Sequence, residues 1–341
     1  MNSGGSSFLP SGAWCGTINR LKFERGSIVE EGENRQRTAG TICALLFLAV
    51  MAGAAQLSGE RELLFPEAAA LAVGAWIAPQ HPWRVRRKQL AAVMTMGALG
   101  GVAIVRWLPG PLVGQVAAGL VLAAVLLTAF GVTLMPLISA CVLPIYLGTQ
   151  SWLYPAAVLA LTLCLALGQW WLERRGLRKP KPAAPPPALG VRVRHWAKTF
   201  AALALFCLPA AWLGLPYLAA PPLLVTFAEL FFPHSPLRQK PLRVLGLLAA
   251  GVWLGFALRL LQANLGLPLV LCAMLGLAGL LPLYRKAEML LPPAAAAALL
   301  PLLLPTENLW RYPVLATLGA ALVVGVPCLV YRRRPPAPAS K

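Results

Sequence analysis

Four polar residues inside apolar stretches of the sequence are the first candidates for chemistry. Glu67 and Glu229 stand near opposite ends of two apolar runs, and Ser139 and Thr226 place hydroxyl groups within such runs. A charged side chain at the centre of a membrane helix costs about 2.5–3.5 kcal/mol on insertion scales, so it usually pairs with another group or marks a path for ions or protons. These residues predict a proton relay or a substrate site. The alternative is a carboxylate that extends to the membrane surface.

Two arginines are the second candidates, because they stand apart from the other basic residues. Arg106 and Arg259 occupy nearly equivalent places, near the expected outer ends of two apolar runs. Guanidinium groups at such places would attract anions into an outward-facing vestibule. The alternative is that both side chains reach to the membrane interface and serve no ligand.

Paired prolines at the starts of two apolar runs are the third candidates. Pro221 and Pro222 stand near the start of one run, and Pro292 and Pro293 near the start of another. A proline removes a backbone donor and frees carbonyl groups that lipid cannot satisfy, so such breaks occur where protein or a water-filled cavity covers them. Helix N-termini at these places would present amide groups and the positive end of the helix dipole, which bind anions. Structural kinks packed against neighbouring helices are the alternative.

Motifs of the common hydrolases, metalloproteases and nucleotide-binding proteins are absent from the sequence. It contains no HExxH, GxSxG or GxxxxGK[ST] pattern, and its three histidines stand in or beside basic loops. The seven cysteines show no CxxC spacing, and six of them lie within apolar runs. The sequence therefore predicts no enzyme activity, no catalytic residue, no metal site and no cofactor.

The composition requires a membrane to position these residues. Apolar residues make up 58% of the 341 residues and charged residues only 12%, whereas soluble domains average about 45–50% and 25%. Each apolar run has roughly the length of a membrane-spanning helix, so we predict an all-α transmembrane bundle of about twelve spans. The runs cover residues 39–57, 63–80, 89–108, 112–130, 132–149, 153–171, 196–214, 216–233, 242–262, 266–284, 288–305 and 312–331.

Lysine and arginine residues gather in short clusters between the apolar runs. The clusters lie in the N-terminal tail, after the second, sixth, eighth and tenth runs, and at the C-terminus. With twelve spans and a cytoplasmic N-terminus, all of them fall on one face, and such loops are retained on the cytoplasmic side. We therefore predict a multi-pass protein of the cell membrane with both termini cytoplasmic. The formal charge of +19 then indicates anionic lipid headgroups, and not nucleic acid, as the partner.

The two halves of the sequence resemble each other. The second run ends in PQHPWR and the eighth in PHSPLR, and WLYP after the fifth run matches WRYP after the eleventh. Because each half crosses the membrane an even number of times, we predict two parallel six-helix repeats related by an axis along the membrane normal. The predicted parts are a disordered cytoplasmic tail (1–38), the first repeat (39–172), a basic proline-rich cytoplasmic linker (173–195), the second repeat (196–331) and a basic cytoplasmic tail (332–341).

A pair of GxxxG patterns recurs at the same register in the two halves. Gly97 and Gly101 lie in the third run, and Gly251 and Gly255 lie in the ninth. In lipid, GxxxG lets two helix backbones approach closely, so that packing holds them together. We expect an internal helix-packing face at both places, and a homodimer interface is the alternative.

Two stretches of the second half resemble a known family. APPLLVTFAELFFPHSPLRQKP (Ala220 to Pro241) is similar to the signature region of the HPP family of integral membrane proteins. LPPAAAAALLPLLLP (Leu291 to Pro305) resembles the His-Pro-Pro-containing span that names the family, with Leu291 in the place of the histidine. The resemblance covers mainly 216–331 and implies transport of a small anion such as nitrite. The second-run pattern is also similar to the fusaric acid and aromatic acid exporter group, which implies export of organic acids.

These observations together predict a transporter or permease for a small anion. A non-transporting membrane scaffold or assembly partner is the alternative, and it is favoured by the scarcity of polar residues within the runs. Parallel repeats bring equivalent segments together around their axis, so the proline-bearing starts, including Pro136, should face the interface between the halves. Thr226 and Ser139 would supply hydroxyl donors there, and Arg106 and Arg259 would guard the outer mouth.

Overall fold

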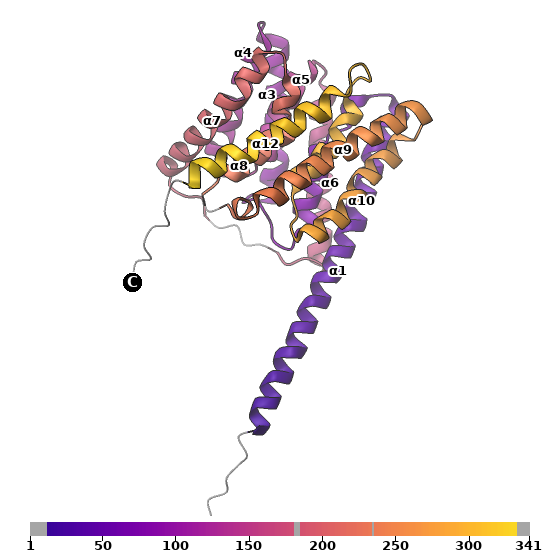
Figure 1. The fold of residues 1–341 in the computed structure, drawn as a ribbon, viewed down its shortest axis with the longest axis vertical. Coiled ribbons are helices and arrows are strands. Elements are labelled where there is room, and N and C mark those ends of the chain that lie inside the picture. Colours follow the sequence, from indigo (N-terminus) through magenta and orange to yellow (C-terminus); the bar gives the residue numbers. More distant parts are fainter. Residues whose placement is uncertain (1–11, 181–184, 234, 333–341) are drawn as a thin grey trace, which may run out of the picture.

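The computed structural model describes residues 12–180, 185–233 and 235–332, and within these ranges the chain is a bundle of helices without strands (Figure 1). Seven of the described helices are long and apolar enough to cross a membrane, by length and composition. They are α1 (Gly12–Ser58, with Asn34–Ser58 as its apolar part), α3 (Arg87–Trp107), α4 (Leu112–Phe130), α6 (Leu153–Arg174), α9 (Pro241–Leu265), α10 (Leu269–Ala287) and α12 (Arg311–Arg332).

Helix α7 (Leu189–Trp212) has a comparable length, but its first turns carry Arg192, Arg194 and Lys198. It begins inside the stretch 173–195 that we expected to be a solvated linker. Another part of that stretch is also ordered against the bundle, because the Arg178 side chain is only 3% exposed. The linker therefore packs against the helices at both of these places, and residues 181–184 lie outside the described residues.

The remaining helices are short, and prolines begin five of them. A helical span needs about 20 residues, and none of these segments reaches that length, so the runs around them are broken. The short elements are η1 (Arg61–Leu63), α2 (Glu67–Ala72) continued by the π-helix η2 (Val73–Ile77), α5 (Pro136–Leu147), η3 (Pro216–Ala219) followed by α8 (Pro221–Phe231), η4 (Pro236–Gln239), and α11 (Pro292–Leu299) continued by the 3₁₀-helix η5 (Leu300–Leu303).

Four of the short helices form the centre of the bundle. Helix α2 packs against α5 and α11, and α8 packs against the same two helices. Every residue of α2 and α11 is buried, and so is nearly every residue of α5 and α8. We call α2, α5, α8 and α11 the central ring. The long helices pack around it.

The contacts of the long helices follow one scheme twice. Helix α3 packs against α5 and α6, and α9 packs against α11 and α12. Helix α1 packs against α10, and α7 packs against α4. The contacts of one half thus recur in the other when each helix is exchanged for its counterpart: α1 for α7, α3 for α9, α4 for α10, α5 for α11 and α6 for α12.

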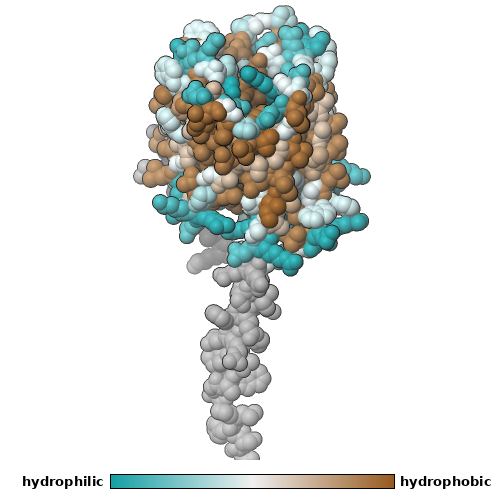
Figure 2. Space-filling view, turned by 90° about the vertical axis from the view of Figure 1, so that its right-hand side faces the viewer, coloured by the Kyte–Doolittle hydropathy of each residue, from teal (hydrophilic) through white to brown (hydrophobic). Residues whose placement is uncertain are grey.

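Large apolar side chains cover the outside of the bundle. Leu57, Leu205, Leu242 and Trp212 are each more than three quarters exposed. Figure 2 shows hydrophobic residues gathered in a belt between two hydrophilic rims. A belt of this kind is the surface that a bilayer covers, and together with the seven long helices it indicates a membrane protein.

The N-terminal helix is longer than its apolar run. Helix α1 begins at Gly12, so residues 12 to 38 continue the helix where we expected a disordered tail. No proline occurs between Gly12 and Ser58 to end it. Figure 1 shows α1 extending from one end of the bundle. Residues 1–11 of the predicted N-terminal tail and residues 333–341 of the predicted C-terminal tail lie outside the described residues.

Candidate functional site

The GxxxG glycines hold the long helices against the central ring. A Cβ atom added at Gly251 or Gly255 would collide with the backbone of α11, at Ala294 and Ala298 respectively. The equivalent atom at Gly97 or Gly101 would collide with residues of α5. The four glycines therefore form an internal packing face, as the first interpretation of the sequence expects, and α5 and α11 cover the surface that a GxxxG dimer would use.

Tyrosines of the repeated WxYP motif complete the hydrogen bonding of two interrupted helices. Pro144 and Pro301 lack an N–H group, so the carbonyl groups four residues earlier lose their helical partners. The Tyr154 hydroxyl donates to one of these carbonyl oxygens, that of Ala140, at 3.4 Å. The Tyr312 hydroxyl donates to the other, that of Ala297, at 2.9 Å. In both halves, the tyrosine thus supplies the hydrogen bond that the matched proline removes.

Arginines lie at the C-terminal ends of all four helical segments of the central ring. The last carbonyl groups of a helix have no helical partner and carry the negative end of the dipole, and lipid offers them no donor. An arginine supplies both hydrogen bonds and positive charge at such an end. Two of these arginines are Arg106 and Arg259, and the other two are Arg178 and Arg238.

The two arginines that we expected at an outer vestibule differ in their surroundings. Arg259 is buried, donates to the Leu304 carbonyl oxygen from Nε at 3.1 Å and Nη2 at 2.9 Å, and donates to Gln262 Oε1 at 2.8 Å. Arg106 is exposed, donates to the Gln150 carbonyl oxygen at 2.9 Å, and lies 5.2 Å from the ring centre of Trp152. The Arg259 guanidinium group thus caps the end of η5, whereas that of Arg106 binds the loop just beyond the end of α5.

The other two arginines belong to clusters that we assigned to lipid headgroups. Arg178 donates to the carbonyl oxygens of Gly74 (3.4 Å) and Ala78 (3.0 Å) at the end of η2. Burial lowers the pKa of its guanidinium to about 10, and the nearby Glu173 carboxylate partly offsets this, so Arg178 remains charged at neutral pH. Arg238 donates to the Phe232 carbonyl oxygen at 2.8 Å and lies over the Tyr331 ring.

Two of the predicted site residues, distant in the sequence, meet inside the central ring. Ser139 of α5 is fully buried and donates a hydrogen bond from its hydroxyl to Oε1 of Glu67, at the first turn of α2. The Glu67 side chain is 1% exposed, and its Oε2 has no hydrogen-bond partner. A carboxyl group with an unsatisfied oxygen in an apolar interior is costly when ionised, so this pair is a candidate for chemistry.

The other predicted polar residues make their hydrogen bonds elsewhere. The Thr226 hydroxyl donates to the Pro222 carbonyl oxygen of its own helix at 2.9 Å. Glu229 accepts a hydrogen bond from Trp83 Nε1 at 3.0 Å, which joins the last turn of α8 to the segment after η2. The Trp83–Glu229 bond ties the two halves together, and the bond within α8 leaves no donor of Thr226 free for a ligand.

The predicted prolines lie at buried helix starts within the central ring. Pro136 begins α5, Pro221 and Pro222 begin α8, and Pro292 and Pro293 begin α11. All five are buried. Pro292 is also the one member of this set that lines the pocket described next.

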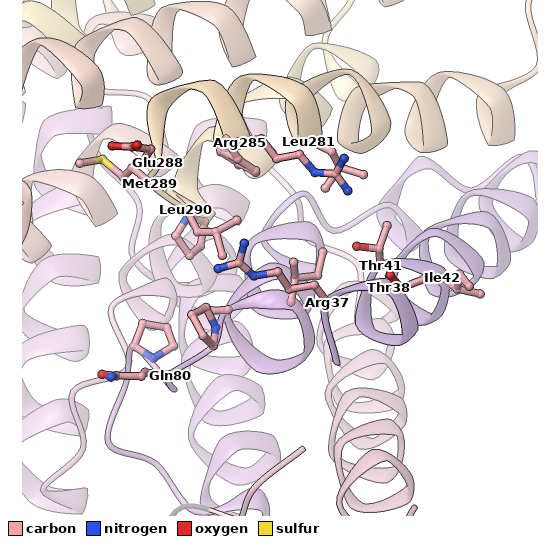
Figure 3. A pocket seen from close by; sticks show the side chains of 16 residues that line it. Arg37, Thr38, Thr41, Ile42, Gln80, Leu281, Arg285, Glu288, Met289 and Leu290 are labelled. Carbon is pink, nitrogen blue, oxygen red and sulfur yellow. The ribbon is translucent and has the colours of Figure 1, made fainter. Parts of the chain in front are cut away.

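A cavity of about 850 Å³ lies between α1, the segment after η2, α10 and the start of α11. Figure 3 shows Arg37 in the middle of this pocket, with Gln80 on one side and Arg285 on the facing wall. Thr38 and Thr41 of α1 add hydroxyl groups. The pocket thus joins elements of the first half to elements of the second.

The charges around the pocket leave it positive. Its carboxylate, Glu288, forms an ion pair with Arg243, with Oε2 and Nη1 3.1 Å apart. Neither Arg37 nor Arg285 takes part in an ion pair among the described residues. Their guanidinium groups are therefore available to an anion, together with the hydroxyl groups of Thr38 and Thr41. The sequence predicts lipid headgroups as the partners of both arginines. The pocket becomes visible only where α1, the segment after η2, α10 and α11 meet in the structure.

Within the described residues, no group of three or more histidine, cysteine, aspartate or glutamate side chains could hold a metal ion. No protein-family model matches the chain, and neither a curated protein nor a solved structure matches it.

Proposed function

We propose that this protein is a membrane transporter of two parallel six-segment repeats that moves a small anion through a binding site in the basic pocket. One observation carries the proposal. A cavity of about 850 Å³ between the halves holds Arg37 and Arg285, and the carboxylate in its lining, Glu288, pairs with Arg243. Paired arginines with hydroxyl groups beside them recognise carboxylate-like and other oxyanions.

The repeated contacts support the two-repeat architecture. Helix α1 lies on α10 as α7 lies on α4, which is the exchange that a two-fold axis between the halves produces. The proline, tyrosine and arginine set of α5 recurs at α11 in the same order. Four helical segments of the central ring are each too short to span, and paired broken segments at the interface of repeats are where transporters place their substrates.

The size and lining of the pocket favour an oxyanion with an apolar body over the smallest inorganic ions. Cavities of roughly 300–1,000 Å³ fit drug-sized ligands. Ile77, Leu281 and Leu290 line this one beside its arginines. An organic acid exporter is therefore the second candidate within the transporter class, next to the nitrite transport that the HPP resemblance implies.

The membrane scaffold is the competing function, and the packing of the central ring favours it. Helix α11 consists of proline, alanine and leucine only, and all its residues are buried. A ring that is sealed in every state would carry no substrate. Transport measurements separate the two functions directly.

The experiment measures anion flux into vesicles that contain the purified protein, with protein-free vesicles subtracted. The probe anions are nitrite, nitrate, benzoate and benzenesulfonate. Arg37→Gln and Arg285→Gln should each raise the half-saturating concentration about tenfold, the loss of one charge-assisted hydrogen bond. Arg35→Gln and Lys286→Gln change neighbouring exposed charges that do not line the pocket, and they should behave as wild type. Flux of no probe anion by the wild type, or equal loss in the control variants, would contradict the proposal.

The orientation is tested by cysteine labelling of intact cells in a background without the seven native cysteines. Ser151→Cys and Thr306→Cys should react with an impermeant reagent, because the basic clusters put their loops outside. Gly190→Cys, in the expected cytoplasmic linker, should react only after the cells are opened. Labelling of Gly190→Cys in intact cells would reverse the orientation and place the basic pocket on the outer face.

A further inference from the structure

We infer that Glu67 binds and releases the proton that accompanies the anion, so that the protein is a proton–anion symporter. The inference rests on the proposed function and adds its coupling ion. Its first support is the geometry of the Glu67 carboxyl group, which is buried, receives one hydrogen bond from Ser139, and keeps an unpartnered Oε2. No lysine, arginine or histidine of the described chain forms an ion pair with it.

The surroundings of Glu67 offer it no compensating charge. Helix α5 contributes the Ser139 hydroxyl, and the hydroxyl groups of Tyr154 on α6 and Tyr312 on α12 lie close enough to interact electrostatically with it. Both tyrosine hydroxyls already donate to carbonyl oxygens of α5 and α11. The buried residues of α1 and all residues of α11 are apolar. The arrangement therefore fits a neutral carboxylic acid, and an ionised one would stand unpaired in an apolar interior.

A single segment connects this carboxyl group to the basic pocket. Glu67 begins α2, which continues through η2 into Ile77, Ala78 and Gln80 of the pocket wall. The eleven helical steps from Glu67 to Ala78 span about 16 Å. The segment thus carries the carboxyl group at one end and forms part of the anion site at the other.

The middle of this segment is a π-helix. This conformation is rare in proteins, and where it does occur it is often at a functional site. The Ala78 N–H donates to the Val73 carbonyl oxygen at 2.8 Å, which closes its wide turn. Trp83 packs over Gly74 of the same turn, and its indole N–H donates to Glu229 of α8. A shift of η2 from this wide turn to an ordinary α-helical one would change the pocket wall and the contact with the second half together.

The charges explain why the proton and the anion travel together. Proton binding forms an O–H bond on Glu67 and changes its charge from −1 to 0, and the bound anion is balanced by Arg37 and Arg285. With both ligands bound, Glu67 is neutral and the anion is paired with the pocket arginines, so the loaded protein can change conformation. Release of the proton alone leaves an unpaired carboxylate, which disfavours the packed ring described here and favours a state in which Glu67 meets water.

The test uses nitrate and benzenesulfonate as probes in vesicles containing the full chain, because their acids do not cross bilayers in neutral form. For wild type, an acid exterior should drive accumulation of the probe at least tenfold above its level without a pH gradient. Glu67→Gln should lose this accumulation and keep exchange of labelled probe at equal pH on both sides. Glu60→Gln changes a nearby carboxylate that is exposed and lies outside the ring; it serves as the matched control and should accumulate as wild type does.

Infrared difference spectroscopy gives a readout that does not depend on flux. The protonated-carboxyl bands of wild type and of Glu60→Gln should include a contribution that is missing in Glu67→Gln. If Glu67→Gln fails to fold, Ser139→Ala replaces it and should shift the pH at which accumulation is half-maximal, because it removes the hydrogen bond to Glu67.

The outcomes separate this inference from the proposed function. Flux that is indifferent to the pH gradient, accumulation that survives in Glu67→Gln, or protonated-carboxyl bands unchanged in Glu67→Gln would overturn the proton role while anion transport stands. A wild type that moves neither nitrate nor benzenesulfonate, nor the weak-acid probes, would overturn transport and the symport with it.

Discussion

The ends of α5 and of α11 with η5 present the same structural problem in two different surroundings. Each segment is interrupted by a proline, is completed by a tyrosine hydroxyl, and ends at an arginine. In the second half the arginine is Arg259, which is buried and makes three hydrogen bonds. In the first half it is Arg106, which is exposed and makes one. The repeat therefore places an arginine near the same end of both segments, while burial decides how much stability depends on it.

The glycines that face these helices show the same difference. At Gly251 and Gly255 an added Cβ meets the α11 backbone. In the first half, an added Cβ meets backbone at Gly101, whereas at Gly97 it meets only the ends of the Leu137 and Cys141 side chains. The alanine residues of α11 let α9 approach its backbone directly. The larger side chains of α5 can change conformation and so make room for an added methyl group at Gly97. The second half should therefore tolerate change less well than the first.

The largest effect should come from Arg259. Arg259→Ala leaves the buried Leu304 carbonyl oxygen without its donor, and we expect the free energy of unfolding to fall by about 3 kcal/mol. Arg106→Ala should cost less than about 1 kcal/mol, because water and the interface replace an exposed cap. Unfolding in detergent micelles measures both. Equal losses at the two positions would show that burial does not distinguish the caps.

A smaller difference should separate the glycines. Gly255→Ala should lower the free energy of unfolding by about 2 kcal/mol, because the backbone of α11 must shift to admit the methyl group. Gly97→Ala should cost less than about 1 kcal/mol, since the Leu137 side chain can change rotamer. A greater loss at Gly97 than at Gly255 would contradict the tighter packing of the second half.

The sequence allows some of these features to be predicted because they are local or repeated. The prolines, the WxYP motifs and the GxxxG pairs each require a neighbouring helix, and their recurrence indicates the repeat. Contacts between distant residues leave no such pattern. Arg178 reaches the end of η2 from 100 positions away, and Ser139 meets Glu67 across 72. The pocket arginines have the same residue type and position as those that orient any membrane protein, so their second role appears only when α1, α10 and α11 meet.

The smallest effect should come from the tyrosines, and here the two halves can be compared within one chemical change. Tyr312→Phe removes a hydrogen bond of 2.9 Å and should cost about 1–1.5 kcal/mol, whereas Tyr154→Phe removes one of 3.4 Å and should cost about 0.5 kcal/mol. Both costs are measured as free energies of unfolding in micelles.

Restoring the N–H donor that proline removes tests whether the tyrosine hydroxyl replaces this missing donor. In α5, Pro144→Ala returns an N–H group that can pair with the Ala140 carbonyl oxygen, so Tyr154→Phe should cost less in that background than in wild type. The difference between the two costs is the coupling energy between Tyr154 and Pro144. A coupling of zero would mean that the tyrosine packs against α5 without serving the carbonyl group that the proline leaves unpaired.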